Sequence, residues 1–404
     1  MNILFVHEVD WSTKVVFDLH SLSELLSSFG HNVFVIDFAS LRNRTDLLDF
    51  GSLKTKELKS AGRAHRDTSI TLIRPGFIKV PFLDRASAFF THYVAIERTI
   101  RNKKIDVIVL YSVPTNGYQV INLAKKYGIP VVFRSIDILH GLVPSKIFWP
   151  LTFSLETWVY KHVDKILTLS PMLCNYVIRM DANKEKVDLL LFGVDLKKFN
   201  PYVQSRELRE NLGLSKDDLV VLYIGTLFEF SGLDLYLEQF SYVVKEIPRA
   251  KLVIVGGGAL FGRLKKRVSE LGLSENVILT GFKPFDVMPQ FINMSSICIN
   301  PFRVTDATRE IIPGKILQYL ACGKPVLATP LPGMISLLKG KPYGLFYSSI
   351  EDFAENTIKL LKDTDIRGQL GETGFQYVKN NHDETKLARR LETILIEKTE
   401  EFKR

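Results

Sequence analysis

The chain has 404 residues, 46% of them hydrophobic, and a formal net charge of +9. A single hydrophobic core stops growing near about 250 to 300 residues, so this length predicts two domains. Three scattered cysteines exclude a disulfide framework and a cysteine-based metal site. The longest apolar-rich stretch, residues 147–160, is too short to cross a membrane. Together these features indicate a cytoplasmic protein.

Continuous apolar runs alternate with helical stretches through the first half of the chain. Runs of this kind are typical of parallel strands that are buried on both faces. They lie at residues 3–6, 33–36, 107–111, 131–133 and 166–169. We therefore expect a doubly wound parallel sheet in residues 1–194, and we expect the irregular, charged segment 42–85 to contain long loops.

Polar residues follow two of these runs, at the strand ends where sheets of this type bind ligands. The loop after the first run contains Asp10 and Lys14, and the loop after the fourth contains Asp137 and His140. A carboxylate or an imidazole in such a loop can orient an acceptor hydroxyl or stabilise positive charge on a reacting ring. The alternatives are helix capping by Asp137 and an ordinary surface position for His140.

A turn-rich segment, Phe192–Pro201, separates the first half from a second series of apolar runs. The second series lies at residues 220–224, 252–255, 277–279, 297–299 and 326–328. It predicts a second doubly wound domain in residues 195–374. The apolar spacing of residues 375–404 predicts a terminal helix that packs back toward the first domain.

Glycines follow the first two runs of the second series. Gly225 begins a loop that also contains Thr226 and Ser231, and Gly257 lies in the glycine triplet 256–258. Glycine allows a phosphate to approach the backbone closely, although a plain βα turn has the same composition. The triplet matches a dinucleotide fingerprint only loosely, because no acidic residue follows in the expected place, so we expect no nicotinamide cofactor.

The segment from Glu310 to Val326 joins a carboxylate, a short helix and a buried strand. Its apolar spacing predicts a helix over Pro313–Ala321, whose unpaired N–H groups would suit a diphosphate. Glu310 precedes this helix, and the amide of Gln318 on the helix could face a ribose or a base. An ordinary αβ unit would look the same. Three nearby cations are candidates for phosphate contacts: Arg303, Arg309 and Lys315.

Taken together, these segments resemble the family 4 glycosyltransferases of the GT-B type over nearly the whole chain. The similar stretches are 28–33, 130–137 and 163–170 in the first half, and 192–201, 221–233, 252–258, 277–281 and 310–326 in the second. The resemblance implies an α/β protein with two Rossmann-like domains facing an interdomain cleft. It also implies retaining transfer of a hexose-type sugar from a nucleotide-diphosphate sugar to an acceptor hydroxyl, with neither metal nor cofactor.

Residue roles follow from the same resemblance. Glu310 would hold the donor sugar and Asp137 would lie near the reacting carbon, both as catalytic residues. Gln318 stands where the family usually has a ribose-binding carboxylate. Thr226 and Ser231 stand where it often has the cations that grip the diphosphate, so this charge would have to come from elsewhere. We expect it to come from the three cations named above, together with the helix N–H groups.

Positive charge is concentrated in residues 1–200, which contain 26 Lys and Arg against 19 Asp and Glu. With the aromatic residues of this half, it predicts docking on an anionic membrane and a sugar or lipid-linked acceptor. The aromatic residues, each of which could equally belong to the core, are Phe77, Phe82, Phe89, Phe90 and Tyr93.

Two alternatives to a sugar transferase are a sugar-nucleotide epimerase of the same fold and a non-catalytic homologue. A nucleic-acid partner is disfavoured, because the chain has no long basic run.

Overall fold

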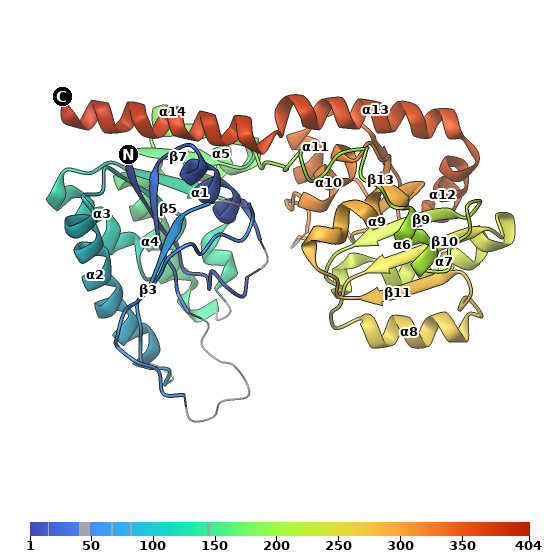
Figure 1. Cartoon of the computed structure of the whole chain (residues 1–404), viewed down its shortest axis with the longest axis horizontal. Coiled ribbons are helices and arrows are strands. Elements are labelled where there is room, and N and C mark those ends of the chain that lie inside the picture. Colours follow the sequence, from blue (N-terminus) through green and yellow to red (C-terminus); the bar gives the residue numbers. More distant parts are fainter. Residues whose placement is uncertain (15, 40–48, 66–67, 81–82, 144–145, 307) are drawn as a thin grey trace. The chain divides into compact units, whose positions relative to one another are not determined.

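The computed structural model describes residues 1–404 except 15, 40–48, 66–67, 81–82, 144–145 and 307. The chain forms two compact units, each built around one sheet (Figure 1). Unit 1 consists of Met1–Phe192 and Glu384–Arg404, and unit 2 consists of Gly193–Asp383. The predicted plan of two α/β domains with parallel sheets is confirmed.

Unit 1 contains an eight-stranded sheet in the order β3-β4-β2-β1-β5-β6-β7-β8. Neighbouring strands pair in parallel, except that β3 runs antiparallel to β4 at one edge. The strands are β1 (Asn2–Val6), β2 (Asn32–Ile36), β3 (Lys56–Leu58), β4 (Ile70–Arg74), β5 (Val107–Leu110), β6 (Val131–Ser135), β7 (Lys165–Thr168) and β8 (Val187–Leu189).

The segment 42–85, in which we expected long loops, also contains the strands β3 and β4. Strand β4 pairs in parallel with β2, and Ile70 and Leu72 on it are buried in the sheet. Its apolar residues are a strand signal, but the charged residues around them obscured it. Residues 40–48 and 66–67 of this segment are outside the described part of the chain.

Helices cover both faces of the first sheet, and the strands that continuous apolar runs predicted, β1, β2, β5, β6 and β7, are largely buried between them, whereas the edge strand β3 is exposed. No helix in the described ranges is both long enough and apolar enough to span a bilayer. The helices of unit 1 are α1 (Asp18–Ser28), α2 (Leu83–Lys103), α3 (Gly117–Tyr127), α4 (Trp149–His162), α5 (Pro171–Arg179) and α14 (Glu384–Lys403), with short 3-10 helices η1 (Leu139–Leu142), η2 (Lys146–Phe148) and η3 (Lys184–Lys186).

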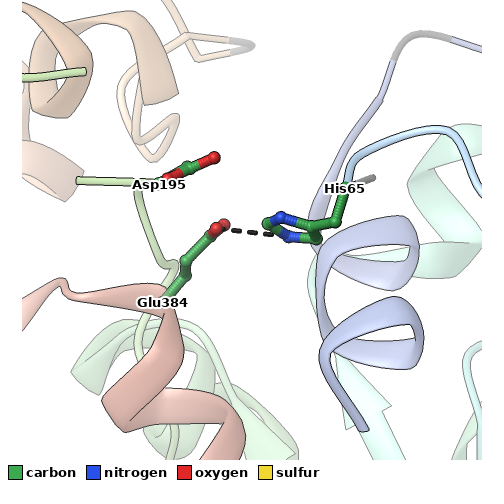
Figure 2. A group of neighbouring side chains, drawn as sticks. All are labelled: His65, Asp195 and Glu384. Atoms are coloured by element: carbon green, nitrogen blue, oxygen red, sulfur yellow. Dashed lines mark ion pairs between the residues drawn. The ribbon is translucent and has the colours of Figure 1, made fainter. Parts of the chain in front are cut away.

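The terminal segment that we expected as one helix over 375–404 is divided between the units. Helix α13 (Thr364–Asn381) belongs to unit 2, whereas α14 packs on α1 in unit 1. Leu391 of α14 is fully buried in the unit 1 core. Glu384 at the start of α14 pairs with His65, with 3.2 Å between the carboxylate and Nε2 (Figure 2). The end of the chain is therefore an integral part of unit 1.

Unit 2 contains a six-stranded parallel sheet in the order β11-β10-β9-β12-β13-β14. Its strands are β9 (Leu219–Ile224), β10 (Ala250–Val255), β11 (Val277–Gly281), β12 (Ile297–Asn300), β13 (Val326–Ala328) and β14 (Leu345–Tyr347). Its helices are α6 (Arg206–Asn211), α7 (Leu233–Glu246), α8 (Phe261–Glu270), α9 (Met288–Met294), α10 (Gly314–Ala321), α11 (Pro332–Leu337), α12 (Phe353–Lys362) and α13, with 3-10 helices η4 (Glu229–Ser231) and η5 (Phe285–Val287).

Candidate functional site

The loops after β9 and β10 are joined to each other through their backbones. Leu227 donates its N–H to the carbonyl of Gly257 at 3.0 Å, and Gly225 donates to Val255 at 2.9 Å. A Cβ atom on Gly256 would lie 2.0 Å from the carbonyl oxygen of Gly225, whereas a Cβ on Gly257 would meet no atom within 4 Å. The glycine that packing requires is therefore Gly256 rather than the predicted donor residue Gly257.

Lys315 directs its amine toward the end of β9. The Nζ atom lies 3.9 Å from the ring centre of Tyr223 and 4.5 Å from that of Phe302. It is also near Gly225, because a Cβ placed on that glycine would lie 3.0 Å from Nζ. Within the described residues, Nζ has neither a carboxylate partner nor a hydrogen-bond acceptor. Burial lowers the pKa of this amine well below its usual range.

Helix α10 begins at Gly314, one residue later than predicted, with Pro313 as its N-cap residue. The Ile224 N–H at the end of β9 donates to the Tyr319 hydroxyl of α10 at 2.7 Å, which fixes the helix against the strand. Gln318 is half-buried and lies one turn after Lys315, so both side chains share a face of α10. Its amide makes no hydrogen bond within the described part of the chain.

The predicted arginines are engaged with carboxylates. Arg303 bonds Asp234 at 2.6 Å. Arg309 pairs with Glu310 at 3.5 Å, and both side chains are partly exposed. The backbone of Glu310 packs against α11, because a Cβ on Gly333 would lie 2.5 Å from the Glu310 carbonyl oxygen. A diphosphate could recruit either arginine only in competition with these carboxylates, whereas Lys315 has none.

The two polar residues of the β9 loop differ in accessibility. Thr226 is exposed, so its hydroxyl is open to a ligand. Ser231 is fully buried in η4. Of the two positions where the resemblance expects cations, only Thr226 therefore faces solvent.

In unit 1, the predicted acceptor residue Asp10 is part of a partly buried ion-pair cluster. Its carboxylate pairs with Arg74 at 3.0 Å and accepts the N–H groups of Ser12 and Thr13 at 2.9 and 3.2 Å. Arg74 also binds the fully buried carboxylate of Asp37. Asp10 therefore shapes the loop after β1, and Lys14 at the end of this loop is exposed.

The loop after β6 brings His140 to a carboxylate that the sequence analysis did not select. Asp137 lies exposed in this loop, and His140 follows in η1. His140 Nδ1 lies 2.9 Å from the carboxylate of Glu156, which is fully buried in α4, and 3.0 Å from the Tyr176 hydroxyl. The signal that could have revealed Glu156 is a single carboxylate within an apolar helical stretch, because a buried charge needs hydrogen-bonding partners.

Models of two glycosyltransferase families match the chain. Residues 18–198 match Glycosyltransferase Family 4, and residues 204–377 match Glycosyl transferases group 1. The chain is 24% identical to the alpha-monoglucosyldiacylglycerol synthase of Streptococcus pneumoniae over 69% of its length and 64% of that protein. It is 22% identical to a UDP-Gal:alpha-D-GlcNAc-diphosphoundecaprenol alpha-1,3-galactosyltransferase of Escherichia coli over 67% of this chain and 70% of that one.

Other curated relatives are matched over part of their length. The chain spans 56% of an uncharacterized glycosyltransferase of Methanocaldococcus jannaschii, to which it is 21% identical over 55% of its own length, and 66% of an alpha-D-kanosaminyltransferase of Streptomyces kanamyceticus.

Solved structures with the same fold cover nearly the whole chain. Anabaena HepE, solved in complex with UDP and glucose, superimposes with a TM-score of 0.71 at 16% identity over 98% of this chain and 99% of that one. Sucrose-phosphate synthase from Thermosynechococcus elongatus gives a TM-score of 0.72 at 18% identity, with 98% of both chains covered. With the two family models spanning both units, the chain belongs to the group 1 glycosyltransferases and has the GT-B fold.

Proposed function

We propose that this protein transfers a sugar from a nucleotide-diphosphate donor to an acceptor hydroxyl, with retention of anomeric configuration and without a metal ion. Unit 2 would bind the donor and unit 1 the acceptor. The family models and the UDP complexes of similar folds support a nucleotide-sugar donor. The proposed product is a glycan or a glycolipid.

The amine of Lys315 is the observation that carries this proposal. The aromatic rings offset only part of the cost of burying this charge, no carboxylate of the described residues lies beside it, and a diphosphate at the end of β9 would supply the missing anion. The unpaired N–H groups at the start of α10 lie beside it. This cation would replace the loop cations that Thr226 and Ser231 do not provide, and it would stabilise the departing diphosphate.

Neighbouring side chains would complete the donor site. Gln318 shares a helix face with Lys315 and would hydrogen-bond the ribose without charge assistance. Glu310 is partly exposed and would hold donor-sugar hydroxyls. Because the leaving diphosphate would take the acceptor proton on the same face of the sugar, retention would follow, with Asp137 near the reacting carbon.

The acceptor is proposed to be lipid-linked and reached from the cytoplasmic face of a membrane. The names of two relatives contain a lipid: the Streptococcus pneumoniae relative is a monoglucosyldiacylglycerol synthase, and the name of the Escherichia coli galactosyltransferase contains diphosphoundecaprenol. On α2, Phe90 and Val94 are 70% and 60% exposed, and Phe89 and Tyr93 are also exposed. Phe77 is buried core, and Phe82 lies outside the described residues. Arg98 and Arg101 follow these exposed apolar side chains on the same helix. Apolar side chains next to basic ones suit binding to an anionic membrane.

A nucleotide panel tests the proposal. Thermal unfolding should shift upward with one or more of UDP, GDP, ADP or CMP and the corresponding sugar nucleotides, because a ligand that binds only the folded state stabilises it. No shift with any of them at millimolar concentration would contradict the donor site. Release of free nucleotide together with an epimerised sugar, rather than sugar transfer, would favour the epimerase.

Retention and metal independence have separate readouts. The anomeric configuration of the first product formed, measured by proton NMR, should equal that of the donor. Activity should persist in excess EDTA, since Lys315 and the helix N–H groups are proposed to meet the diphosphate charge. Inversion, or loss of activity that Mg²⁺ restores, would contradict the respective part of the proposal.

A further inference from the structure

Glu156 is a fully buried carboxylate whose oxygens are all engaged around η1. It accepts the backbone N–H groups of Leu139 and His140 at 3.3 and 3.1 Å and the Tyr160 hydroxyl at 2.6 Å. It also meets His140 Nδ1 at 2.9 Å. Because burying a carboxylate is unfavourable without such donors, this set fixes both the backbone of η1 and the position of the imidazole.

The carboxylate also decides which imidazole nitrogen is left for a ligand. An ionised carboxylate only accepts hydrogen bonds, so Nδ1 must carry a proton and donate it. The Tyr176 oxygen, 3.0 Å from the same nitrogen, shares that proton. In the neutral ring Nε2 is then an acceptor, and it has no partner within the described part of the chain. The His140 side chain is 19% exposed, so this nitrogen is near solvent.

Aromatic and apolar side chains surround the imidazole. The rings of Phe153 and Trp149 stand edge-on to it at 5.3 and 6.0 Å between centres. Phe153 is 44% exposed, and Ile147 and Leu151 nearby in sequence are more exposed still. Rings beside a hydrogen-bonding group suit a sugar, which has an apolar C–H face and a rim of hydroxyls.

We propose that His140, held by Glu156, is a recognition site for a sugar hydroxyl of the acceptor. Nε2 accepts the hydrogen bond of that hydroxyl while the C–H face of the sugar lies on Phe153 and Trp149, and an apolar aglycone reaches the exposed residues at the start of α4. Glu156 is a positioning residue that acts through His140. The assignment of this sugar as an acceptor rests on the transfer reaction proposed above.

Octyl β-D-glucoside below its micelle concentration is a suitable probe, because it joins a hydroxyl-rich ring to an alkyl chain. In nitrogen-15 NMR of the full-length protein, free His140 should show the tautomer protonated on Nδ1, and the probe should shift the Nε2 resonance in a saturable manner. His162, an exposed histidine at the end of α4, is the internal control and should not shift. An unchanged Nε2 resonance, or an equal shift of His162, would overturn the proposal.

Variants separate positioning from folding. Glu156→Gln should mix the two tautomers of His140 and weaken binding of the probe by about tenfold. Tyr176→Phe keeps the carboxylate of Glu156, so this variant should bind the probe nearly as tightly as the wild type. If Glu156→Gln unfolds, His140→Gln, which leaves Glu156 in place, should abolish the response while near-UV circular dichroism stays native. Wild-type affinity in a folded His140→Gln protein would overturn the proposal.

The nucleotide panel, run on the same samples, keeps this inference distinct from the proposed function. Nucleotide stabilisation with an unresponsive His140 would overturn the hydroxyl site and leave the transferase standing. A specific His140 response without stabilisation by any nucleotide would support the sugar site and remove its role in transfer.

Discussion

Lys315 links donor binding to pH. Its pKa is lowered by burial, so the free protein holds the amine neutral at a pH where an ordinary lysine is charged. A bound diphosphate favours the charged form of the Lys315 amine. At a pH above the lowered pKa, binding of the donor must therefore be accompanied by uptake of a proton. We expect donor affinity to fall as pH rises through the lowered pKa, and calorimetry in two buffers of different ionisation enthalpy, repeated over a series of pH values, should detect the uptake.

Lys315→Met should remove this proton uptake and weaken nucleotide binding by about tenfold or more, which corresponds to about 1.4 kcal/mol. The variant should also be more stable than wild type near neutral pH, since it no longer buries an amine without a partner. Lys324→Met is the matched control: burial lowers the pKa of Lys324 as well, but it follows the other end of α10. Equal effects of the two substitutions on binding would contradict the assignment.

Two buried histidines in unit 1 give the protein a stability that acid should remove. Burial lowers the pKa of His7 to about 3 and that of His20 to about 4, with the positive charges of neighbouring groups adding to the effect. Both values lie below the unfolded value near 6.5, so the unfolded state binds more protons between about pH 6.5 and 4. Stability is complete above that window and is lost as pH falls through it.

Urea unfolding at pH 7.5 and 5.5 measures this loss, which amounts to about 1.4 kcal/mol per pH unit for each histidine. His20→Gln should show a smaller difference between the two pH values than wild type. His162→Gln, at an exposed site, should show the wild-type difference. An undiminished difference in His20→Gln would mean that other groups account for the acid sensitivity.

At the scale of elements, the loops after β9 and β10 depend on individual glycines. Gly256 has φ +146 and no room for a Cβ beside the Gly225 carbonyl, whereas Gly257 has open space around it. Gly256→Ala should therefore destabilise the protein by more than about 2 kcal/mol, and Gly257→Ala should change stability by less than about 1 kcal/mol. Chemical unfolding of the two variants measures the contrast, and similar losses would show that the loops relax around a methyl group.

At the scale of the whole molecule, membrane docking should depend on the exposed apolar side of α2 and on charge. Flotation with phosphatidylglycerol vesicles should carry the protein, and phosphatidylcholine vesicles or high salt should not. Phe90→Asp should reduce binding. Phe282→Asp, at an 81% exposed phenylalanine of unit 2, should not. Binding that is indifferent to lipid charge and to Phe90 would contradict the electrostatic docking proposed for unit 1.

The sequence by itself predicted the two parallel sheets and most of their strands, whereas the order of the strands within each sheet came only from the structure. Continuous apolar runs report burial on both faces, and this signal is local because it depends on neighbouring residues alone. The helix of the Glu310 to Val326 segment was predicted to within one residue for the same reason. The edge strands β3, β8 and β14 were not predicted, because a strand of three residues carries too little of a pattern. Strand β4 was not predicted either, because charged residues surround its apolar ones.

Only the tertiary structure decided which polar groups are available to a ligand. Arg303 meets Asp234 from 69 residues away, and Asp10 meets Arg74 from 64 residues away, so no local pattern could show that these charges are already paired. The partnership of His140 with Glu156 likewise required η1 to pack on α4. Local sequence fixes where a strand or helix forms, whereas the partners of a charge depend on which distant elements pack beside it. In the described part of the chain, that packing left Lys315 with aromatic rings but no carboxylate, and the Nε2 atom of His140 without a hydrogen-bond partner.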